Sequence, residues 1–200
     1  MVNVKLSKEG NPKAKHQVVS LKTPLKTEDI ENLEIGTIVC ISGVIYTSRD
    51  SAHKRMVECL EQDKPMPIDV KGQIIYYVGP TPTRPGQVIG SCGPTTSYRM
   101  DPYTPTMLAQ GMKGMIGKGP RSQEVIDAIV KYKGIYLAAV GGAAALISKC
   151  VKRASVVAYE DLGPEAIYRL EVEDFPCIVA IDCKGNNLYE VGKKRFQVIE

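Results

Sequence analysis

SQEVIDAIVKYKGIYLAAV, residues 122–140, is the stretch of sequence that decides the fold class. Its apolar residues from Val125 to Val130 recur at helical spacing, which predicts a helix. Gly134 then ends the helix, and an almost unbroken apolar run continues to Val140. Because such runs are typical of strands buried on both faces of a sheet, the stretch indicates an α/β domain.

Weaker patterns of both kinds lie on either side of this stretch. Short apolar runs bounded by turn residues predict strands at residues 18–21, 36–46, 73–78, 155–159 and 177–182. Helical patterns predict helices at residues 27–33, 51–62, 103–112 and 164–167, and in the alanines before Cys150. Asp50 or Ser51 is placed to cap the helix at 51–62, and the turn at 184–187 predicts a hairpin leading to Leu188. We therefore expect an α/β layered domain with a mixed sheet.

The length and composition are those of one globular domain. The chain has 200 residues, of which 44% are hydrophobic and 24% charged, and these proportions exclude a disordered or fibrous protein. Residues 1–17 are basic and polar and are predicted to form a loose arm, which leaves residues 18–200 as the single domain. The formal net charge of +4 is small and scattered, which argues against a nucleic-acid surface.

The sequence also argues against a membrane protein. No apolar run approaches the roughly 18 to 20 residues that a membrane-spanning helix needs. The N-terminus Met1–Lys5 has no hydrophobic signal core. We therefore expect a cytoplasmic protein with no membrane partner.

The cysteines show no local metal-binding pattern. The chain has six of them, at Cys40, Cys59, Cys92, Cys150, Cys177 and Cys183. No CxxC pair occurs, which argues against a zinc site or a self-contained iron–sulfur site, and the absence of a signal peptide argues against a disulfide framework. Most of the cysteines are expected to be buried thiols, and this chain is predicted to supply no metal ligands.

The first candidate site segment is TSRDSAH, residues 47–53, at a predicted strand-to-helix junction. The positive end of a helix dipole favours anions, so Arg49 beside the helix N-terminus indicates an anion site. The alternative is that Arg49 only pairs with a neighbouring carboxylate, Asp50 or Glu58. His53 is expected to be a structural hydrogen-bonding residue rather than an acid–base catalyst.

The second segment is GSCGPTTSYRMD, residues 90–101. Four hydroxyl side chains lie close to Arg99, and Gly93 would let the backbone approach a ligand. Hydroxyls, amide N–H groups and the guanidinium could together bind a carboxylate or a phosphate. Turn chemistry alone also explains the Gly-Pro-Thr-Thr run, but it does not explain the arginine. Asp101 is expected either to neutralise Arg99 or to hold it in position.

The third segment is GMIGKG, residues 114–119, which carries Lys118. It lacks the GxxxxGK[ST] pattern of a phosphate-binding loop, and GGAAA at 141–145 lacks the GxGxxG pattern, so nucleotide binding is disfavoured. Arg49, Arg99 and Lys118 together supply three cations. Two or three fixed cations suit a small dicarboxylate.

Five motifs give the sequence a family resemblance: TxRDxAH (47–53), GPTTxxRMD (93–101), GKG (117–119), GGAA (141–144) and LGPEAI (162–167). Together they resemble the β subunit of class I fumarate hydratase and L-tartrate dehydratase, which is the C-terminal domain in single-chain relatives. The resemblance implies a swivelling β/β/α domain, three layers with a mixed sheet.

The resemblance also implies an activity. The reaction would be the reversible hydration or dehydration of a small dicarboxylate, with fumarate and (S)-malate as the expected pair. A four-iron, four-sulfur cluster is implied as the Lewis acid for the departing hydroxyl, and its cysteines would belong to an α subunit rather than to this chain. The chain is therefore expected to work in a hetero-oligomer with that α subunit, to be inactive alone, and to be able to form a homo-oligomer when isolated.

Residue roles follow from the same resemblance. Arg49, Arg99 and Lys118 would bind the substrate carboxylates, and Thr95 would remove the proton from the carbon next to a carboxylate. Threonine is a weak base at neutral pH, so this role requires cationic neighbours that stabilise its alkoxide. The remaining residues carried over are Thr96 and Gly93 in substrate binding, and Asp50, Asp101 and His53 in support of the binding residues.

Two alternatives stay open. The substrate could be L-tartrate, dehydrated to oxaloacetate, because the two substrate classes differ by a single hydroxyl group. The chain could also be a noncatalytic anion-binding or assembly module with the same fold. If the α subunit exists, we expect an exposed apolar surface where it docks.

Overall fold

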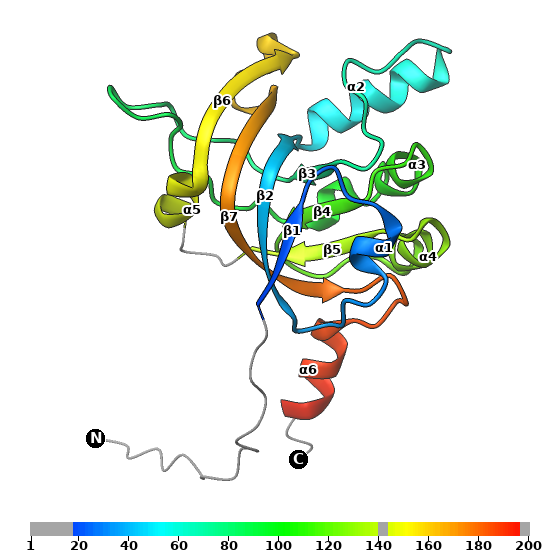
Figure 1. Ribbon diagram of the computed structural model, residues 1–200. Coiled ribbons are helices and arrows are strands. Elements are labelled where there is room, and N and C mark those ends of the chain that lie inside the picture. The colour runs from blue at the N-terminus through cyan, green and yellow to red at the C-terminus, as the bar shows by residue number, and fades with distance from the viewer. Residues whose placement is uncertain (1–17, 140–143, 197–200) are drawn as a thin grey trace, which may run out of the picture.

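The computed structural model describes residues 18–139 and 144–196, and Figure 1 shows their arrangement. The predicted polar arm, residues 1–17, lies outside the described residues. The same holds for Val140 and for residues 141–143 of the GGAA motif. Both the predicted strand that ends at Val140 and the glycine pair after it are therefore described only in part.

The described residues alternate between strands and helices. The strands are β1 (Val18–Lys22), β2 (Ile38–Thr47), β3 (Ile74–Tyr76), β4 (Gly114–Gly117), β5 (Ile135–Ala138), β6 (Val151–Ala158) and β7 (Ile167–Ile181). The α-helices are α1 (Thr27–Ile30), α2 (Asp50–Glu61), α3 (Thr104–Ala109), α4 (Gln123–Tyr132), α5 (Ala144–Cys150) and α6 (Leu188–Phe196). The 3-10 helices are η1 (Ser97–Met100) and η2 (Glu160–Glu165).

All the strands belong to one mixed sheet, in the order β1-β2-β3-β4-β5-β7-β6. Neighbouring strands from β1 to β5 are parallel, whereas β7 runs antiparallel to β5 and to β6. β7 also pairs antiparallel with β2, so β2, β3, β4, β5 and β7 close into a five-stranded ring. The predicted mixed α/β architecture is confirmed.

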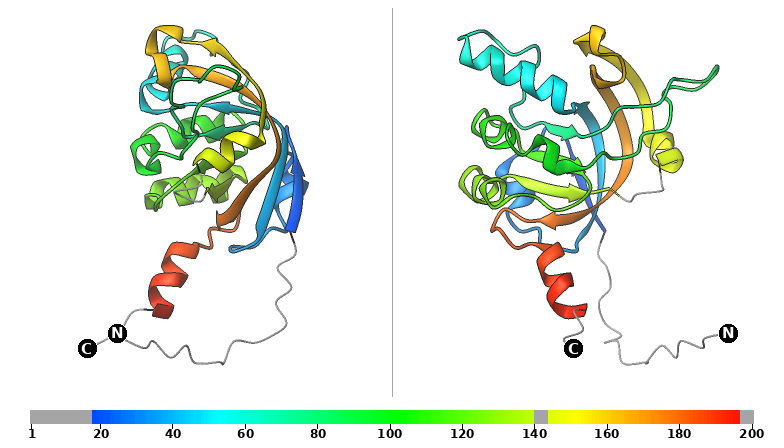
Figure 2. Two further views of the ribbon diagram at one scale, coloured as in Figure 1. Left: turned by 90° about the vertical axis from the view of Figure 1, so that its left-hand side faces the viewer. Right: turned by 180° about the vertical axis from the view of Figure 1, so that it is seen from behind.

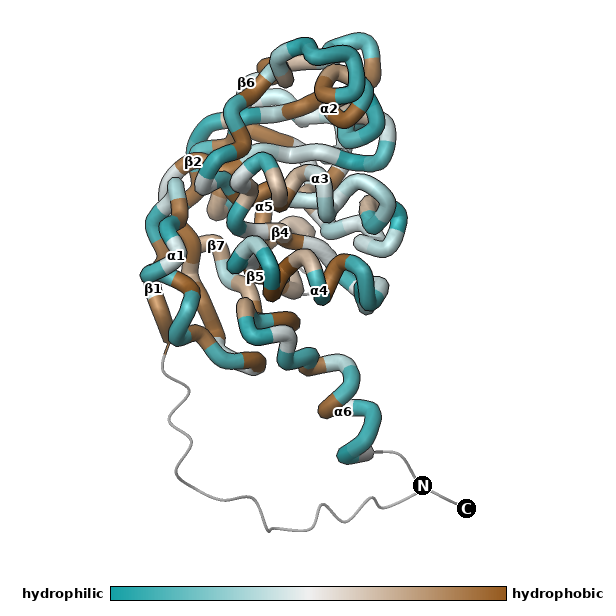
Figure 3. The backbone as a smooth tube through the Cα atoms, turned by 90° about the vertical axis from the view of Figure 1, so that its right-hand side faces the viewer, coloured by the Kyte–Doolittle hydropathy of each residue, from teal (hydrophilic) through white to brown (hydrophobic). Residues whose placement is uncertain are grey.

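Side chains on the two faces of the sheet enter two different hydrophobic clusters. Ile74 and Tyr76 of β3 join a cluster built largely from the strands, whereas Ile75 of β3 and Tyr77, which directly follows it, join a second cluster with residues of α2, α3 and α4. This alternation follows from the two-residue repeat of a strand. Figure 2 shows α2, α3 and α4 one above another on one side of the sheet. In Figure 3 much of the hydrophobic colour lies in the strands, and hydrophilic residues are most frequent in helices and loops.

The start of α2 differs from the prediction. Arg49 occupies the N-cap position and makes no side-chain cap hydrogen bond, and Asp50 is the first residue of the helix. The prediction that Asp50 or Ser51 caps the helix was wrong. The carboxylate of Asp50 contacts the guanidinium of Arg99 instead.

The glycine-rich segment of the chain forms a strand, β4, which the sequence did not predict. A Cβ atom at Gly114 would lie 2.8 Å from Cγ1 of Ile74, and one at Gly117 would lie 2.0 Å from Oγ of Ser97. Glycine is unfavourable in strands, but here it permits a close approach of neighbouring chain segments.

Two chain reversals also differ from the prediction. α4 ends at Tyr132, and its C-cap residue Lys133, rather than the expected Gly134, adopts the left-handed conformation with φ of 52°. The turn at 184–187 leads into α6 rather than into a second strand, although Ile181 and Asn187 form an isolated bridge across it.

No helix within residues 18–139 and 144–196 has the length and apolar character needed to cross a membrane.

Candidate active site

Three neighbouring parallel strands bring the candidate segments to one edge of the sheet. β2, β3 and β4 are adjacent, so their carboxyl ends lie together, where α/β sheets commonly bind ligands. Arg49 follows β2, and Lys118 follows β4 directly. Thr95 is held at the end of β3, because its N–H donates to the carbonyl of Tyr77 over 2.8 Å.

The threonine segment is also fastened to the lysine segment. The N–H of Ser97 donates to the carbonyl of Lys118 over 2.9 Å, and Thr96 and Lys118 form an isolated parallel bridge. The close packing of Ser97 against Gly117 is possible only because that position has no side chain. All three predicted segments therefore meet at this edge of the sheet.

A row of alternating charges crosses the site. Nη2 of Arg49 lies 3.0 Å from Oε1 of Glu165, and its Nε lies 3.8 Å from Oδ1 of Asp50. The other oxygen of Asp50 accepts a hydrogen bond of 2.7 Å from Nη2 of Arg99. Lys118 is exposed, and its amine has no hydrogen-bond or ion-pair partner among the residues that the structure describes. The site is therefore rich in cations that a carboxylate can reach.

The possibility that Arg49 merely pairs with Asp50 or Glu58 is thus only partly realised. Asp50 is at the edge of contact distance, and Glu58 lies 3.8 Å from Lys54 instead. The shortest contact of Arg49 is with Glu165, which the sequence did not single out as a site residue. The LGPEAI motif contains Glu165, so the motif itself was the available signal.

Buried polar atoms without partners gather around Arg49. Within the described part of the chain, four of them belong to this cluster: Nε of Arg49, Oδ1 of Asp50, Nε2 of His53 and Oε2 of Glu165. Buried polar atoms in native proteins are nearly always hydrogen-bonded, so each unpartnered atom calls for an explanation. Their concentration here is what a site completed by a ligand or water would show.

His53 is fully buried and contacts the backbone carbonyl of Arg49. Its Nδ1 lies 2.9 Å from the carbonyl oxygen of Arg49 and 2.7 Å from Oγ of Ser48, and only a protonated Nδ1 can donate to the carbonyl. Burial lowers the pKa of His53 from 6.5 to about 4, so the ring is neutral at physiological pH. His53 thus fixes the backbone at the end of β2.

Asp101 does not contact Arg99 in the way the sequence suggested. Its Oδ1 accepts a hydrogen bond of 2.7 Å from Nε of Arg121, and its Oδ2 accepts one of 2.7 Å from the N–H of Ser122. The expectation that Asp101 neutralises or holds Arg99 was wrong. η1 turns the side chain of Asp101 inward, where it is buried, while Arg99 stays exposed.

The guanidinium of Arg121 is completely buried, and sequence reasoning missed it. Besides Asp101, its Nη2 donates to Oγ1 of Thr104 over 2.7 Å. Its central carbon lies 5.4 Å from the ring centre of Tyr77 and 5.0 Å from that of Tyr136, which are cation–π distances. A buried arginine with this many partners ties α3 and the start of α4 to the sheet.

A tyrosine hydroxyl joins the two loops of the site. The O–H of Tyr136 lies 2.9 Å from Oγ of Ser97 and 2.8 Å from the carbonyl oxygen of Gly119. Ser97 directly follows Thr96, and Gly119 directly follows Lys118. The hydroxyl of Tyr136 therefore fixes the distance between the threonine segment and the lysine segment. Burial raises the pKa of Tyr136 far above its usual range, which keeps this hydroxyl protonated.

All six cysteines are free thiols, of which Cys92, Cys177 and Cys183 are buried, and burial raises the pKa of Cys92 to about 12. No group of three histidine, cysteine, aspartate or glutamate residues in the described ranges is placed to hold a metal ion.

A Cβ atom at Gly93 would lie 3.3 Å from Cβ of Ala144, so the glycine lets α5 approach the threonine segment.

Residues 3–192 match the Fumarase C-terminus family. The chain belongs to this family. Fumarate hydratase 2 of Leishmania major is 38% identical over 86% of this chain, and anaerobic class I fumarate hydratase of Escherichia coli is 39% identical over 86%. These matches cover 31% and 32% of the two relatives, so the chain spans about a third of their length. The putative L(+)-tartrate dehydratase subunit beta of Methanocaldococcus jannaschii is 39% identical over 86% of this chain and 92% of that protein.

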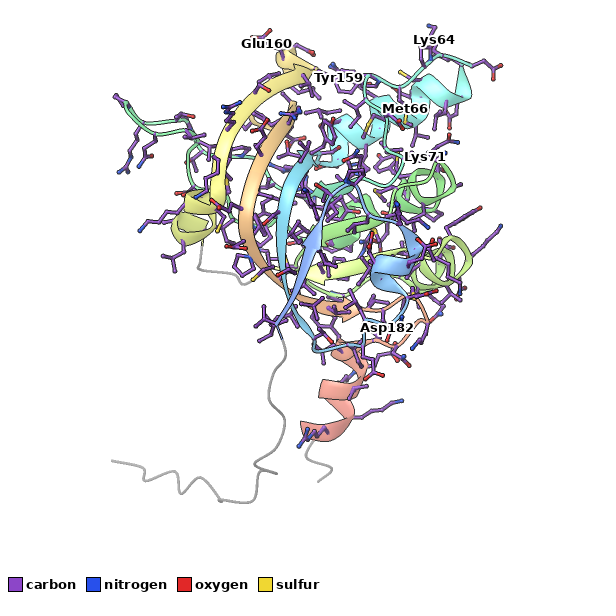
Figure 4. The ribbon with its side chains drawn as sticks, viewed as in Figure 1. Lys64, Met66, Lys71, Tyr159, Glu160 and Asp182 are labelled. Atoms are coloured by element: carbon purple, nitrogen blue, oxygen red, sulfur yellow. The ribbon has the colours of Figure 1, made fainter. Side chains whose placement is uncertain are left out.

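Membership of the Fumarase C-terminus family agrees with the resemblance expected from the motifs. The match covers every segment that forms the site, from Arg49 through Lys118 to Glu165. Figure 4 shows Tyr159 and Glu160, where η2 begins, at one end of the molecule, and Asp182 near the opposite end.

Proposed function

We propose that this chain is the β subunit of an iron–sulfur hydro-lyase that hydrates and dehydrates a small dicarboxylate, with fumarate and (S)-malate as the substrate pair. The observation that carries the proposal is the convergence of Arg49, Thr95 and Lys118 at the carboxyl edge of β2, β3 and β4 in a chain of this family. The domain would span residues 18–200, adopt the swivelling β/β/α fold and work in the cytoplasm.

Three cations would bind the two carboxylates of the substrate. Arg49 and Arg99 each keep donors free after their contacts with Asp50 and Glu165, because a guanidinium has five N–H groups. Lys118 adds a point charge that has no partner within the described residues. The site would then present forked donors to the carboxylates and a mobile ammonium beside them.

Thr95 would act as the base that removes the proton from the carbon next to a carboxylate. Its backbone is fixed by the carbonyl of Tyr77, and the adjoining Thr96 lies in bridge pairing with Lys118. Nearby cations lower the free energy of an alkoxide, which a threonine needs in this role. Gly93 and Thr96 would complete the contacts to the substrate.

The described residues offer no set of ligands that fits an iron–sulfur cluster. In this proposal the four-iron, four-sulfur cluster would belong to an α subunit and would supply Lewis-acid chemistry for the departing hydroxyl. The chemistry assigned to this chain is carboxylate binding and proton removal. The active species would be a hetero-oligomer of the two subunits.

The surface beside the site offers apolar side chains for such a partner. Val88 in the loop after β3 is 49% exposed, and Leu146 of α5 is 65% exposed. A cavity of about 280 Å³ is lined from this loop, from α5 and from Val151 of β6, so the three elements adjoin one another. Exposed apolar side chains on adjoining elements support a docking surface for the α subunit.

L-tartrate is the second candidate substrate. The observation that favours it is the match to the putative L(+)-tartrate dehydratase subunit beta, which is 39% identical over 86% of this chain and 92% of that protein. Both reactions need the same carboxylate ligands and the same base. Comparison of turnover with fumarate, malate and tartrate would decide between the substrates.

The test is an anaerobic reconstitution of this chain with a cluster-bearing α subunit. Thr95→Ala should lower kcat by about 10²- to 10⁴-fold, the usual contribution of a general base. Thr83→Ala is the matched control, because Thr83 is exposed in the loop after β3. Full activity of the Thr95→Ala complex would exclude Thr95 as the base. Binding of fumarate or tartrate without turnover with any α subunit would instead favour the noncatalytic module.

A further inference from the structure

We infer that Glu165 is a positioning residue that aims Arg49 at the substrate. This inference rests on the proposed function, because it concerns the same carboxylate site. Glu165 makes the shortest charged contact of Arg49, with 3.0 Å between Oε1 and Nη2. Both side chains are only 22% exposed, so solvent and salt weaken this ion pair less than they weaken an ordinary surface ion pair.

The backbone around Glu165 is shaped to deliver this carboxylate. Gly163 lies inside η2 with φ of 56° and ψ of −119°, a kink that favours glycine. Oγ1 of the buried Thr47 donates to the carbonyl of Ala166 and accepts from the N–H of Tyr168 over 3.0 Å. Thr47, which ends β2 two residues before Arg49, therefore holds the backbone that directly follows Glu165.

Arg49 is also packed closely against a glycine. A Cβ atom at Gly79 would lie 3.1 Å from Nη1 of Arg49 and 3.1 Å from the carbonyl oxygen of Pro164. The guanidinium therefore occupies a narrow space between the end of β3 and η2. In this space the guanidinium reaches Glu165 through Nη2.

A second ion pair joins the same two elements without touching the site. Arg55 of α2 and Asp161 of η2 form a pair with contacts of 2.9 and 2.6 Å. Their side chains are 38% and 63% exposed. This pair can fasten η2 to α2, so fastening alone does not account for Glu165.

The unpartnered atoms point to the same role. Oε2 of Glu165 and Nε of Arg49 are both buried without a hydrogen-bond partner in the described chain. A pair built only for stability would use both oxygens on the guanidinium fork. The single contact leaves Arg49 with donors for a substrate carboxylate, while Glu165 fixes the direction of the guanidinium.

The inference is tested in the reconstituted complex with Glu165→Gln against Asp161→Asn. Glu165→Gln should raise the KM for the dicarboxylate about tenfold and lower kcat/KM by on the order of 10- to 100-fold, because a misplaced binding group costs that much. Its melting temperature should match that of Asp161→Asn. The Asp161→Asn complex should keep the KM and kcat of the unmodified complex.

Gly79→Ala provides an independent variant that removes no charge. Its added methyl group displaces the guanidinium of Arg49, so the KM should rise here too. Glu165→Asp keeps the charge and should recover part of the lost kcat/KM. Unchanged kinetics for Glu165→Gln would overturn the inference, and so would a fall in kcat and melting temperature at constant KM.

Binding of succinate, an unreactive dicarboxylate, separates this inference from the proposed function. Calorimetry on the full chain should show weaker binding for Glu165→Gln than for Asp161→Asn. If the unmodified complex shows no turnover, the proposed function fails, yet the binding comparison still judges Glu165. Equal succinate affinities for the two variants would overturn the positioning role.

Discussion

Two arginine–carboxylate clusters flank the carboxyl edge of the sheet, and they are built in opposite ways. In the first, Arg121 is completely buried and contacts Asp101, Thr104 and two tyrosine rings. In the second, Arg49 is 22% exposed and, with its neighbours, leaves polar atoms unpartnered within the described residues. One cluster is saturated and closed, whereas the other is unsaturated and open.

The difference separates what holds the site from what the site can bind. Arg121 contacts Met115 through Nη1 and two oxygens through its other nitrogens, so no ligand could displace these partners without leaving a buried charge unpaired. The open cluster can add partners at small cost, because its side chains are partly exposed and several of their polar atoms have no hydrogen bond to lose. Removing an arginine from the closed cluster should therefore damage stability, and removing one from the open cluster should damage binding.

The largest expected effect on stability comes from Arg121→Met. The substitution leaves the carboxylate of Asp101 buried without its cation, which should cost about 3 to 5 kcal/mol of the free energy of unfolding. Chemical denaturation of the full chain measures this loss. The double variant Asp101→Asn/Arg121→Met should be less unstable than Arg121→Met alone. A loss below about 1 kcal/mol would mean that the cluster is not closed.

The next effect concerns the pH dependence of stability. His53 has a pKa of about 4 in the folded chain and 6.5 in the unfolded chain, so the unfolded chain binds more protons between these values. The free energy of unfolding should therefore fall by about 3 kcal/mol as the pH drops from 6.5 to 4. His53→Asn should lose this part of the slope. An identical slope for both chains would show that His53 does not carry it.

The smallest effect on stability should follow Arg99→Met, the same substitution placed in the open cluster. Arg99 is 40% exposed in its pair with Asp50, so its loss should cost no more than about 1 kcal/mol. Loss of a charged hydrogen bond to the substrate should nevertheless lower kcat/KM about 10- to 100-fold. Steady-state kinetics of the reconstituted complex gives this value. A large stability loss with normal kinetics would reverse the comparison between the clusters.

Local sequence patterns predicted much of the fold and brought out the site segments. α4 and β5 follow from the apolar stripe and the apolar run in the stretch that begins at Ser122. Arg49 was expected at a strand-to-helix junction, and β2 ends and α2 begins on either side of it. These features depend on residues a few positions apart, which is the range over which helical and strand periodicities act.

Features that depend on distant segments were not predictable. Glycine carries no strand signal, and β4 exists because the glycines let Ile74 and Ser97 pack closely against it. The partner of Asp101 is Arg121 and not Arg99, although Arg99 is only two residues away. The direction in which η1 turns each side chain decides this choice, and that direction is set by tertiary packing.

The long strand β7 determines the order in which the fold can be completed. It hydrogen-bonds to β2 and β5 inside the ring and to β6 outside it, and its residue Ile178 pairs with Ile38. A ribosome therefore releases β2 through β5 long before the strand that joins them into a ring. Until residues 167–181 emerge, β2 and β5 have exposed edges, and such edges are prone to pairing with other chains. Contacts this distant in sequence also slow folding. The edges of β2 and β5 therefore stay open to pairing with other chains until β7 has been synthesised.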